Sequence, residues 1–226
     1  NGGNPDTVEA QDDQNAHHRG AGRTVVTGKN GEAILDLIMA TTQTGPQSYD
    51  VPQKAFHWLT AALTAAQFVI AWTMTDPPEG SPPIGLMNLH LSVGSTILML
   101  TIMRLLWRLT HAVPAPPRDI PRWQQAASRA THLSFYVILI AMPIAGWTWA
   151  SAKGWPVTLF GIVRLPALTT PGNGLGEIAG EIHELLGIAL LALLALHVAA
   201  ALRHHFLKDG ILARMLPGSS TRTNAA

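Results

Sequence analysis

Four histidines of this chain lie inside or at the edges of apolar stretches that are long enough to cross a lipid bilayer. They are His57, His90, His183 and His197. Because an ionisable side chain is costly in hydrocarbon, a histidine at membrane depth indicates a function. Imidazole is a common axial ligand of haem iron, and iron ligation would account for all four residues together.

The spacing of these histidines predicts two sites at different depths. His183 and His197 are 14 residues apart, which in a helix is a rise of about 21 Å and a rotation of about 40°, so one helix face carries both. His90 is expected at the depth of His183, near the outer face, and His57 at the depth of His197, near the cytoplasmic face. We therefore predict two haems, each clamped by two imidazoles. An iron with both axial positions filled favours electron transfer over oxygen binding.

Three other interpretations stay open for these residues. A single membrane histidine could simply bond to a neighbouring backbone or a bound water. Zinc binding fits less well, because a structural zinc site needs four ligands at one depth. A haem-free transporter or metal channel, with the histidines lining its pathway, is the third.

The segments that must position the histidines have the character of membrane-spanning helices. Of the 226 residues, 47% are hydrophobic and 13% are charged, against roughly 25% charged in soluble domains. Windows of about 20 apolar residues cover 55–74, 86–106, 131–150 and 182–202. A helix of a soluble bundle would carry a polar stripe, yet residues 185–202 include no charged side chain. The predicted fold is an all-α membrane protein, a bundle of four transmembrane helices.

The distribution of basic residues predicts that both termini are cytoplasmic, because positively charged loops stay on that side of the membrane. Nine basic residues flank the spans on one side: Lys54, Arg108, Arg118, Arg122, Arg129, Arg203, Lys208, Arg214 and Arg222. The loops on the opposite side contain two basic and four acidic residues: Lys153, Arg164, Asp76, Glu79, Glu177 and Glu181.

Composition argues against several other classes of protein. The net charge of +1 and the lack of a basic stripe argue against nucleic-acid binding. The chain has no cysteine, which removes covalently attached c-type haem, thiolate iron–sulfur clusters, thiol catalysis and disulfide bonds. Any haem is therefore held noncovalently, through histidine.

Both ends of the chain have the composition of polar tails. Residues 1–50 are rich in Asn, Gln, Asp, Gly and Thr, and such a segment cannot bury enough apolar surface to fold alone. We expect disordered tails over 1–50 and 218–226 around a membrane domain over 51–217. Met39 opens a short polar lead into the first span, so we predict that the working protein starts near it. Residues 1–38 found intact by mass spectrometry of the natively expressed protein would contradict this.

Other residues could contact a haem at its edges. Arg104 lies 14 residues after His90, on nearly the same helix face and at the depth of the cytoplasmic site, where a haem propionate is a suitable partner. Anchoring to lipid headgroups is the alternative. Small residues that leave room for a flat macrocycle, or for close helix packing, follow the ligands: Gly94, Gly187, Ala200 and Ala201. Three boundary histidines could bond propionates or a quinone, or be structural: His132, His204 and His205.

Several segments resemble the bacterial cytochrome b561 family, which is related to the hydrogenase-type b cytochromes. The resemblance covers about residues 51–217. Its most specific pieces are FHW at 56–58, MNLHLSVG at 87–94, THLSFYVILIAMPIAG at 131–146 and IHELLGIALLALLALHVAAALRHHFLKDGILARMLP at 182–217.

This resemblance implies a multi-pass protein of the bacterial inner membrane with two b haems, which moves electrons between the quinone pool and a redox partner outside. The family ligands fall on His57, His90, His183 and His197, and dimers occur among relatives. Some relatives are thought to oxidise superoxide and reduce ubiquinone, a reaction that a basic outer surface would favour. The outer loops here are acidic on balance. A superoxide:ubiquinone oxidoreductase is therefore the alternative to an electron carrier.

Overall fold

The computed structural model describes residues 48–78, 80–115 and 120–218. The chain divides into two units, 1–44 and 45–226, and the first of these lies outside the described residues. The predictions of a disordered tail and of a start near Met39 concern residues that are not described, apart from 48–50. The same holds for three residues of the charge analysis: Glu79, Arg118 and Arg222.

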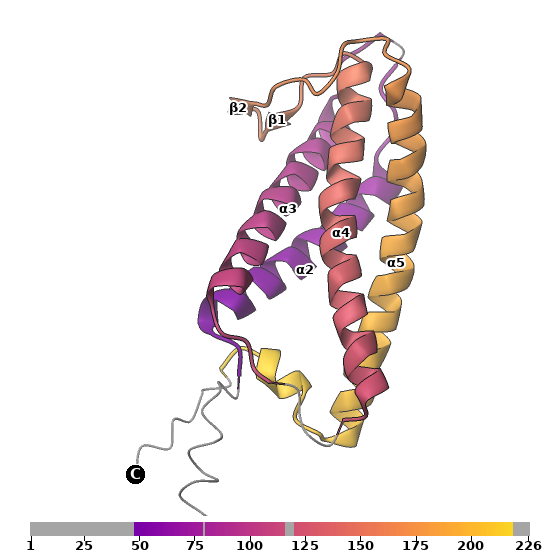
Figure 1. Cartoon of the computed structure of the whole chain (residues 1–226). Helices are drawn as coiled ribbons and strands as arrows, with labels where there is room; N and C mark the ends of the chain where they lie inside the picture. Colours follow the sequence, from indigo (N-terminus) through magenta and orange to yellow (C-terminus); the bar gives the residue numbers. More distant parts are fainter. Residues whose placement is uncertain (1–47, 79, 116–119, 219–226) are drawn as a thin grey trace, which may run out of the picture. The chain divides into compact units, whose positions relative to one another are not determined.

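Four long helices make up the described part of the chain and correspond to the four predicted spans. They are α2 (Val51–Thr73), α3 (Gly85–Thr110), α4 (Arg122–Ala152) and α5 (Leu175–Leu207) (Figure 1). Each is long and apolar enough to cross a membrane. The predicted four-helix membrane fold is confirmed, and every helix extends beyond its apolar window at both ends except α2, which ends one residue early.

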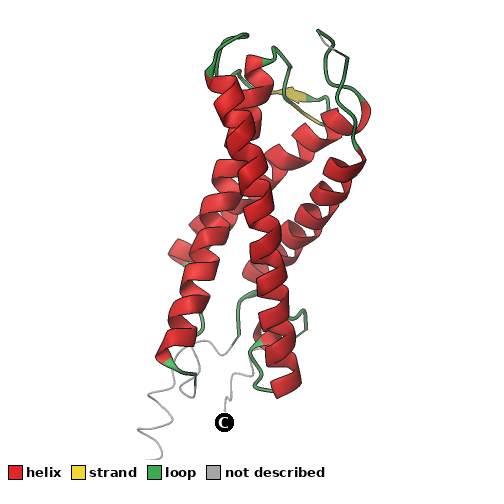
Figure 2. Cartoon of the chain, turned by 90° about the vertical axis from the view of Figure 1, so that its right-hand side faces the viewer, coloured by secondary structure: helices red, strands yellow, loops and turns green. Residues whose placement is uncertain are grey.

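Consecutive helices are neighbours in the bundle: α2 packs on α3, α3 on α4, and α4 most extensively on α5. Figure 2 shows α4 and α5 crossing in front of the other two helices. Helices α3, α4 and α5 meet in one buried apolar cluster, made by Val93, Ile97, Leu139 and Leu190. Partly buried side chains of α2 pack against the same cluster. Leu190 of this cluster is seven residues from both His183 and His197, so the core lies between the two histidines of α5.

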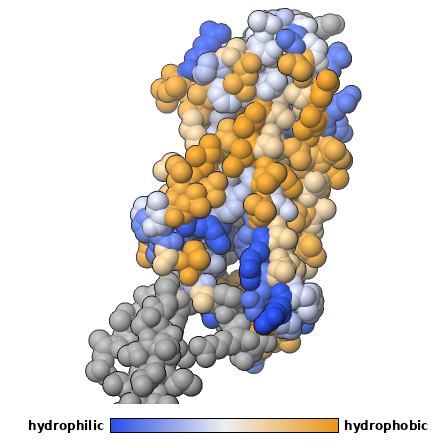
Figure 3. Space-filling model, viewed as in Figure 1, coloured by the Kyte–Doolittle hydropathy of each residue, from blue (hydrophilic) through white to orange (hydrophobic). Residues whose placement is uncertain are grey.

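The outward faces of the helices are apolar. Leu185, Ile188 and Leu196 of α5 are each more than 60% exposed, and Figure 3 shows hydrophobic side chains over much of the visible face. Exposed leucine and isoleucine in such density is unusual in water but is what contact with lipid requires. The protein is therefore a multi-pass membrane protein.

A small hairpin covers one end of the bundle, which we call the hairpin end. Its strands are β1 (Thr158–Leu159) and β2 (Val163–Arg164), paired antiparallel. Ser92 of α3 is 1% exposed; its hydroxyl donates to the Thr158 carbonyl at 2.8 Å and accepts from the Phe160 N–H at 3.1 Å. The hairpin is thus attached to α3 two residues away from His90.

The C-terminal segment closes the opposite end. Residues 209–217, here called the strap, include the short 3-10 helix η1 (Leu212–Met215). The Arg214 carbonyl accepts hydrogen bonds from the Ser48 hydroxyl at 3.0 Å and the Tyr49 N–H at 3.3 Å, and the Met215 carbonyl accepts one from the Trp58 indole at 2.9 Å. Residues 48–50, which the sequence assigned to the polar tail, therefore contact the membrane domain.

Candidate functional site

The structure brings the four histidines together in the two pairs that the sequence predicts. The His90 and His183 ring centroids are 6.0 Å apart with an interplanar angle of 74°. Those of His57 and His197 are 6.4 Å apart at 66°. We call the first the hairpin pair and the second the strap pair, after the end of the bundle where each lies. Helix α5 supplies one member of each pair, and α2 and α3 supply the others.

Both separations match the span of an iron held between two imidazoles. Two metal–nitrogen bonds of about 2.0 Å in line with two ring radii of about 1.1 Å place the ring centroids about 6 Å apart. Within the described ranges no three His, Cys, Asp or Glu side chains converge on one point. Each pair therefore offers two nitrogen donors, the set that haem iron takes from a protein, and not the four-ligand set of structural zinc.

The hairpin pair is held by backbone groups of α4. The Nδ1–H of His183 donates to the Met142 carbonyl at 2.8 Å, which leaves Nε2 with a free lone pair, as a metal ligand needs. Gly146 makes this position possible, since a Cβ there would lie 2.8 Å from the His183 ring. His90 is only 9% exposed, and its Nδ1 is buried without a hydrogen-bond partner among the described residues.

The strap pair is surrounded by polar side chains from other helices. The Arg104 guanidinium donates to Nδ1 of His57 at 3.1 Å and lies 5.8 Å from the centre of the Tyr136 ring. Arg104 thus turns into the bundle and not toward lipid headgroups. His132 is a third imidazole here, 5.8 Å from the His197 ring, and its Nδ1–H donates to the Ser128 carbonyl at 2.7 Å.

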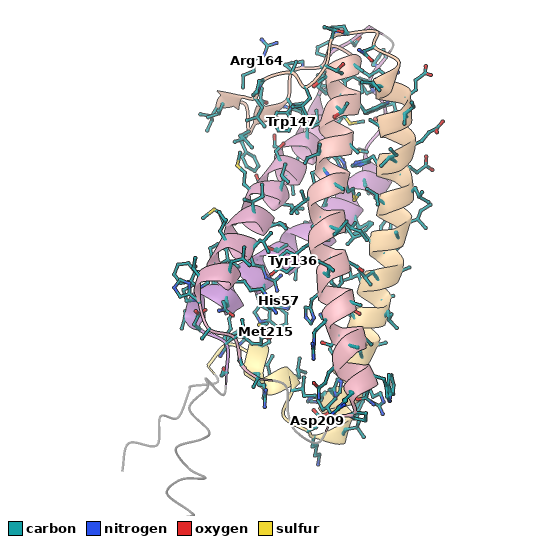
Figure 4. All side chains as sticks on the ribbon, viewed as in Figure 1. His57, Tyr136, Trp147, Arg164, Asp209 and Met215 are labelled. Atoms are coloured by element: carbon teal, nitrogen blue, oxygen red, sulfur yellow. The ribbon has the colours of Figure 1, made fainter. Side chains whose placement is uncertain are left out.

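A hollow opens beside the strap pair. It is lined by Tyr49, Gln53, Arg104, Arg108, Tyr136 and Met215, and it is small, with room for about one water molecule. Figure 4 shows His57, Tyr136 and Met215 near one another at this end of the bundle. Two guanidinium groups, two phenols and an amide make the hollow rich in hydrogen-bond donors, which suits a ligand with carbonyl or carboxylate oxygens.

Other residues named from the sequence have different surroundings. His204 donates to Asp209 where the strap begins. His205 packs on Phe206. A Cβ at Gly94 would lie 3.2 Å from the Gln67 amide nitrogen, and one at Gly187 would lie 3.3 Å from the Met142 methyl group. The two glycines therefore make room for side chains of neighbouring helices.

Sequence reasoning missed several residues that the structure places at the sites. Gln67 donates from its amide to the His90 carbonyl at 2.9 Å, and Gly146 and the Met142 carbonyl position His183. Tyr136 and Met215 line the hollow. An uncharged but strongly polar amide within an apolar span was a signal for Gln67, whereas a backbone carbonyl leaves no mark in the sequence.

Comparison with known proteins gives consistent matches over the described part of the chain. The model of the family "Prokaryotic cytochrome b561" matches residues 48–218. "Cytochrome b561 homolog 2" of Escherichia coli (strain K12) is 34% identical over 189 residues, covering 81% of this chain and 98% of that protein. "Cytochrome b561 homolog 1" of the same organism is 28% identical over 167 residues, covering 73% and 94%. "Probable superoxide oxidase CybB" of Yersinia pestis is 30% identical over 177 residues, covering 76% and 97%.

Proposed function

Because the chain belongs to the prokaryotic cytochrome b561 family, and is thus a membrane electron-transfer protein, we propose that it is a dihaem b-type cytochrome. The hairpin pair, His90 and His183, ligates one haem, here the hairpin haem. The strap pair, His57 and His197, ligates the other, the strap haem. The observation that carries this proposal is the presence of two imidazole pairs whose ring separations of 6.0 and 6.4 Å suit an iron between them.

Different residues of the chain have different roles at the two sites. A bound haem supplies a one-electron centre, Fe(III)/Fe(II), and two imidazoles leave it no position for oxygen. Helix α5 fixes the spacing of the two sites, since its ligands are 14 residues apart, about 21 Å along the axis. When His57 binds iron through Nε2, its Nδ1 carries the proton and can no longer accept the hydrogen bond from Arg104, so the guanidinium is assigned to a propionate of the strap haem. Backbone and amide groups orient the ligands of the hairpin haem.

We assign the strap end to the cytoplasm and the hairpin end to the outside, so that both termini are cytoplasmic. Support comes from charge. The described residues flanking the spans at the strap end include Lys54, Arg108, Arg122, Arg129, Arg203, Lys208 and Arg214. The loops at the hairpin end contain Lys153 and Arg164. This asymmetry follows the positive-inside rule, and labelling of Lys153 from the outside of intact cells would test it.

We assign quinone exchange in a respiratory chain to the hollow beside the strap pair. Its donors, above all Arg108 and Tyr136, suit the two carbonyl oxygens of a quinone, and Met215 of the strap supplies an apolar wall. Reduction of the strap haem by a water-soluble quinol should therefore be slower in Arg108→Leu than in wild type. An equal rate in both would place quinone exchange elsewhere.

A superoxide:ubiquinone oxidoreductase is the second candidate function, and the similarity to "Probable superoxide oxidase CybB" favours it. The acidic balance of the outer loops argues against it, because such a surface repels the anion. The two candidates differ in one measurement. Rapid haem reduction by generated superoxide, abolished by superoxide dismutase, would identify the oxidoreductase, and slow reduction would leave the electron carrier.

Optical redox titration of the purified protein tests the haem content. We expect a reduced-minus-oxidised b-type spectrum that titrates as two one-electron centres. A protein without a b-type spectrum would favour a haem-free transporter, and a single centre would contradict the two-pair assignment. Size-exclusion chromatography with light scattering would test the predicted homodimer.

A further inference from the structure

We propose that Gln67 of α2 is a positioning residue for the hairpin haem: its side-chain carbonyl accepts a hydrogen bond from the Nδ1–H of His90 when Nε2 of His90 ligates iron. The inference rests on the proposed function, because it requires His90 to be a ligand. Gln67 is not one of the four histidines, and it lies on α2, a helix that supplies no ligand to the hairpin haem.

The first observation is that Gln67 and His90, which contact each other, each have a buried polar atom without a hydrogen-bond partner among the described residues. Among the described residues, three buried side-chain polar atoms lack a hydrogen-bond partner: Thr60 Oγ1, Gln67 Oε1 and His90 Nδ1. Gln67 and His90 are already in contact, since the Gln67 amide nitrogen donates to the His90 backbone carbonyl at 2.9 Å. Thr60 is seven residues before Gln67, about 10 Å away along α2, so it cannot serve the same imidazole.

The two unsatisfied atoms are chemically complementary once His90 binds iron. A neutral imidazole that ligates through Nε2 carries its proton on Nδ1, which makes Nδ1 a donor, whereas an amide oxygen only accepts. Histidines bound to metals almost always donate their second N–H to a carbonyl, a carboxylate or water. His183 does so to the Met142 carbonyl at 2.8 Å. Gln67 gives His90 the equivalent acceptor.

The surroundings hold the Gln67 amide in place. Its nitrogen is fixed by the His90 carbonyl, and Gly94 leaves the space in which the amide lies, because a Cβ at position 94 would be 3.2 Å from that nitrogen. With the nitrogen bonded to the His90 carbonyl, the oxygen of the same amide also lies close to His90, while Nδ1 of His90 has no other acceptor among the described residues. The carbonyl oxygen of His90 requires a donor and its Nδ1–H requires an acceptor. An amide side chain carries both, on the same carbon atom.

The proposal predicts a change in one haem of the full-length, haem-loaded protein. Gln67→Leu removes the acceptor, which lowers the basicity of the His90 imidazole and so weakens its preference for Fe(III). The midpoint potential of the hairpin haem should rise, and the g values of its oxidised low-spin EPR signal should shift, while the strap haem keeps both. Gly94→Ala, which displaces the amide without changing its chemistry, should shift the same signals in the same direction.

Gln67→Glu separates the acceptor from simple packing. Glutamate keeps an oxygen acceptor but cannot donate to the His90 carbonyl when ionised, so the potential of the hairpin haem should stay at or below the wild-type value. Thr64→Val is the matched control, because Thr64 is buried on the same helix three residues earlier and its replacement leaves the Gln67–His90 contact intact. Both haems should be unchanged in that variant.

Redox titration and EPR of all five proteins decide between the outcomes. A higher potential of the hairpin haem in Gln67→Leu, with no rise in Gln67→Glu, would support the proposal. Potentials and g values in Gln67→Leu identical to wild type would overturn it, as would equal upward shifts, or equal loss of the haem, in the leucine and glutamate variants. A wild-type protein that lacks the hairpin haem would instead refute the proposed function and this inference together.

Discussion

The two histidine pairs have the same composition but different surroundings. Around the hairpin pair, fixed groups dominate: the Met142 carbonyl holds His183, Gly146 lies against its ring, and the hairpin is attached through buried Ser92. Around the strap pair, long polar side chains dominate, and Arg104 contacts His57 beside a hollow. The covering segment there is held mainly through hydrogen bonds to the carbonyls of Arg214 and Met215.

This difference bears on the proposed function, in which the two ends have different tasks. A site bounded by backbone and glycine has little freedom to rearrange, which suits a haem that only transfers electrons. Long side chains such as those of Arg104 and Tyr136 can move, which suits an end where a quinone exchanges electrons. Variants that act on one end only can therefore test whether the two ends differ in this way.

Removal of a ligand should have the largest effect. His183→Ala should eliminate the hairpin haem and His57→Ala the strap haem, because each pair spans its iron only if both rings are present. Optical redox titration should then show one centre in each variant, with different midpoint potentials in the two. If both variants lost the same centre, the pairing would be wrong.

Gly146→Ala should come next in size and act only at the hairpin end. A Cβ at this position would lie 2.8 Å from the His183 ring, so the ring must move away from its place beneath Met142. Overpacking of this kind costs about 1–3 kcal/mol, and the hairpin haem should be partly lost while the strap haem remains. Haem content per protein measures the effect.

Gly187→Ala is the matched control for that change, because the nearest atom to its new Cβ is the mobile methyl end of Met142 at 3.3 Å. It should keep both haems. Equal haem loss in the two variants would show that α4 and α5 tolerate no added volume anywhere, and that Gly146 has no particular role toward His183.

The fold and the pairing of the histidines could be predicted from sequence because both depend on periodic, strong signals. Apolar windows of bilayer length give the helices, and 14-residue spacing on α5 gives two depths. The contacts around the histidines could not be derived in this way. Gly94 and Gly187 were expected to leave room either for a macrocycle or for close helix packing, and the packing of Gln67 and Met142 against them depends on how helices far apart in sequence cross.

The hollow could not be predicted from the sequence either, for a different reason. Its lining comes from α2, α3, α4 and the strap, and from Tyr49 in a segment whose composition resembles a disordered tail. Arg104 was identified as a contact residue from its helix face, yet two directions for its side chain were open. Only the three-dimensional arrangement shows it against His57 and Tyr136.

Arg104→Leu should produce an effect of about the same size as Gly146→Ala, at the opposite end. Hydrogen bonds to charged groups contribute about 1.5–3 kcal/mol, so loss of the guanidinium should weaken retention of the strap haem by about 10- to 100-fold. Arg104→Lys keeps the charge and should fall between leucine and wild type. Transfer of haem to apomyoglobin, followed separately for the two centres, measures retention. An equal effect on the hairpin haem would contradict a local role.

The attachment of the strap should show the smallest effect, as a weak dependence on pH. Partial burial raises the pKa of Asp209. Hydrogen bonds from His204 and the Ile211 N–H, together with the charge of Arg203, lower it by more than burial raises it, so the pKa lies below its usual value. A depressed carboxyl pKa stabilises the attached strap above the usual pKa of aspartate, and this contribution is lost as the pH falls through the lowered value. The pair lies at the surface, with side chains 22% and 31% exposed, so it contributes at most about 1 kcal/mol.

Hydrogen exchange over residues 209–217, corrected for intrinsic rates, measures this contribution. In wild type the exchange should accelerate in acid. Asp209→Asn should exchange slightly faster than wild type at neutral pH and show no further acceleration in acid. A wild-type profile that is flat in acid would mean that the strap is held by its backbone hydrogen bonds alone, and the strap end would then resemble the hairpin end more closely than its side chains suggest.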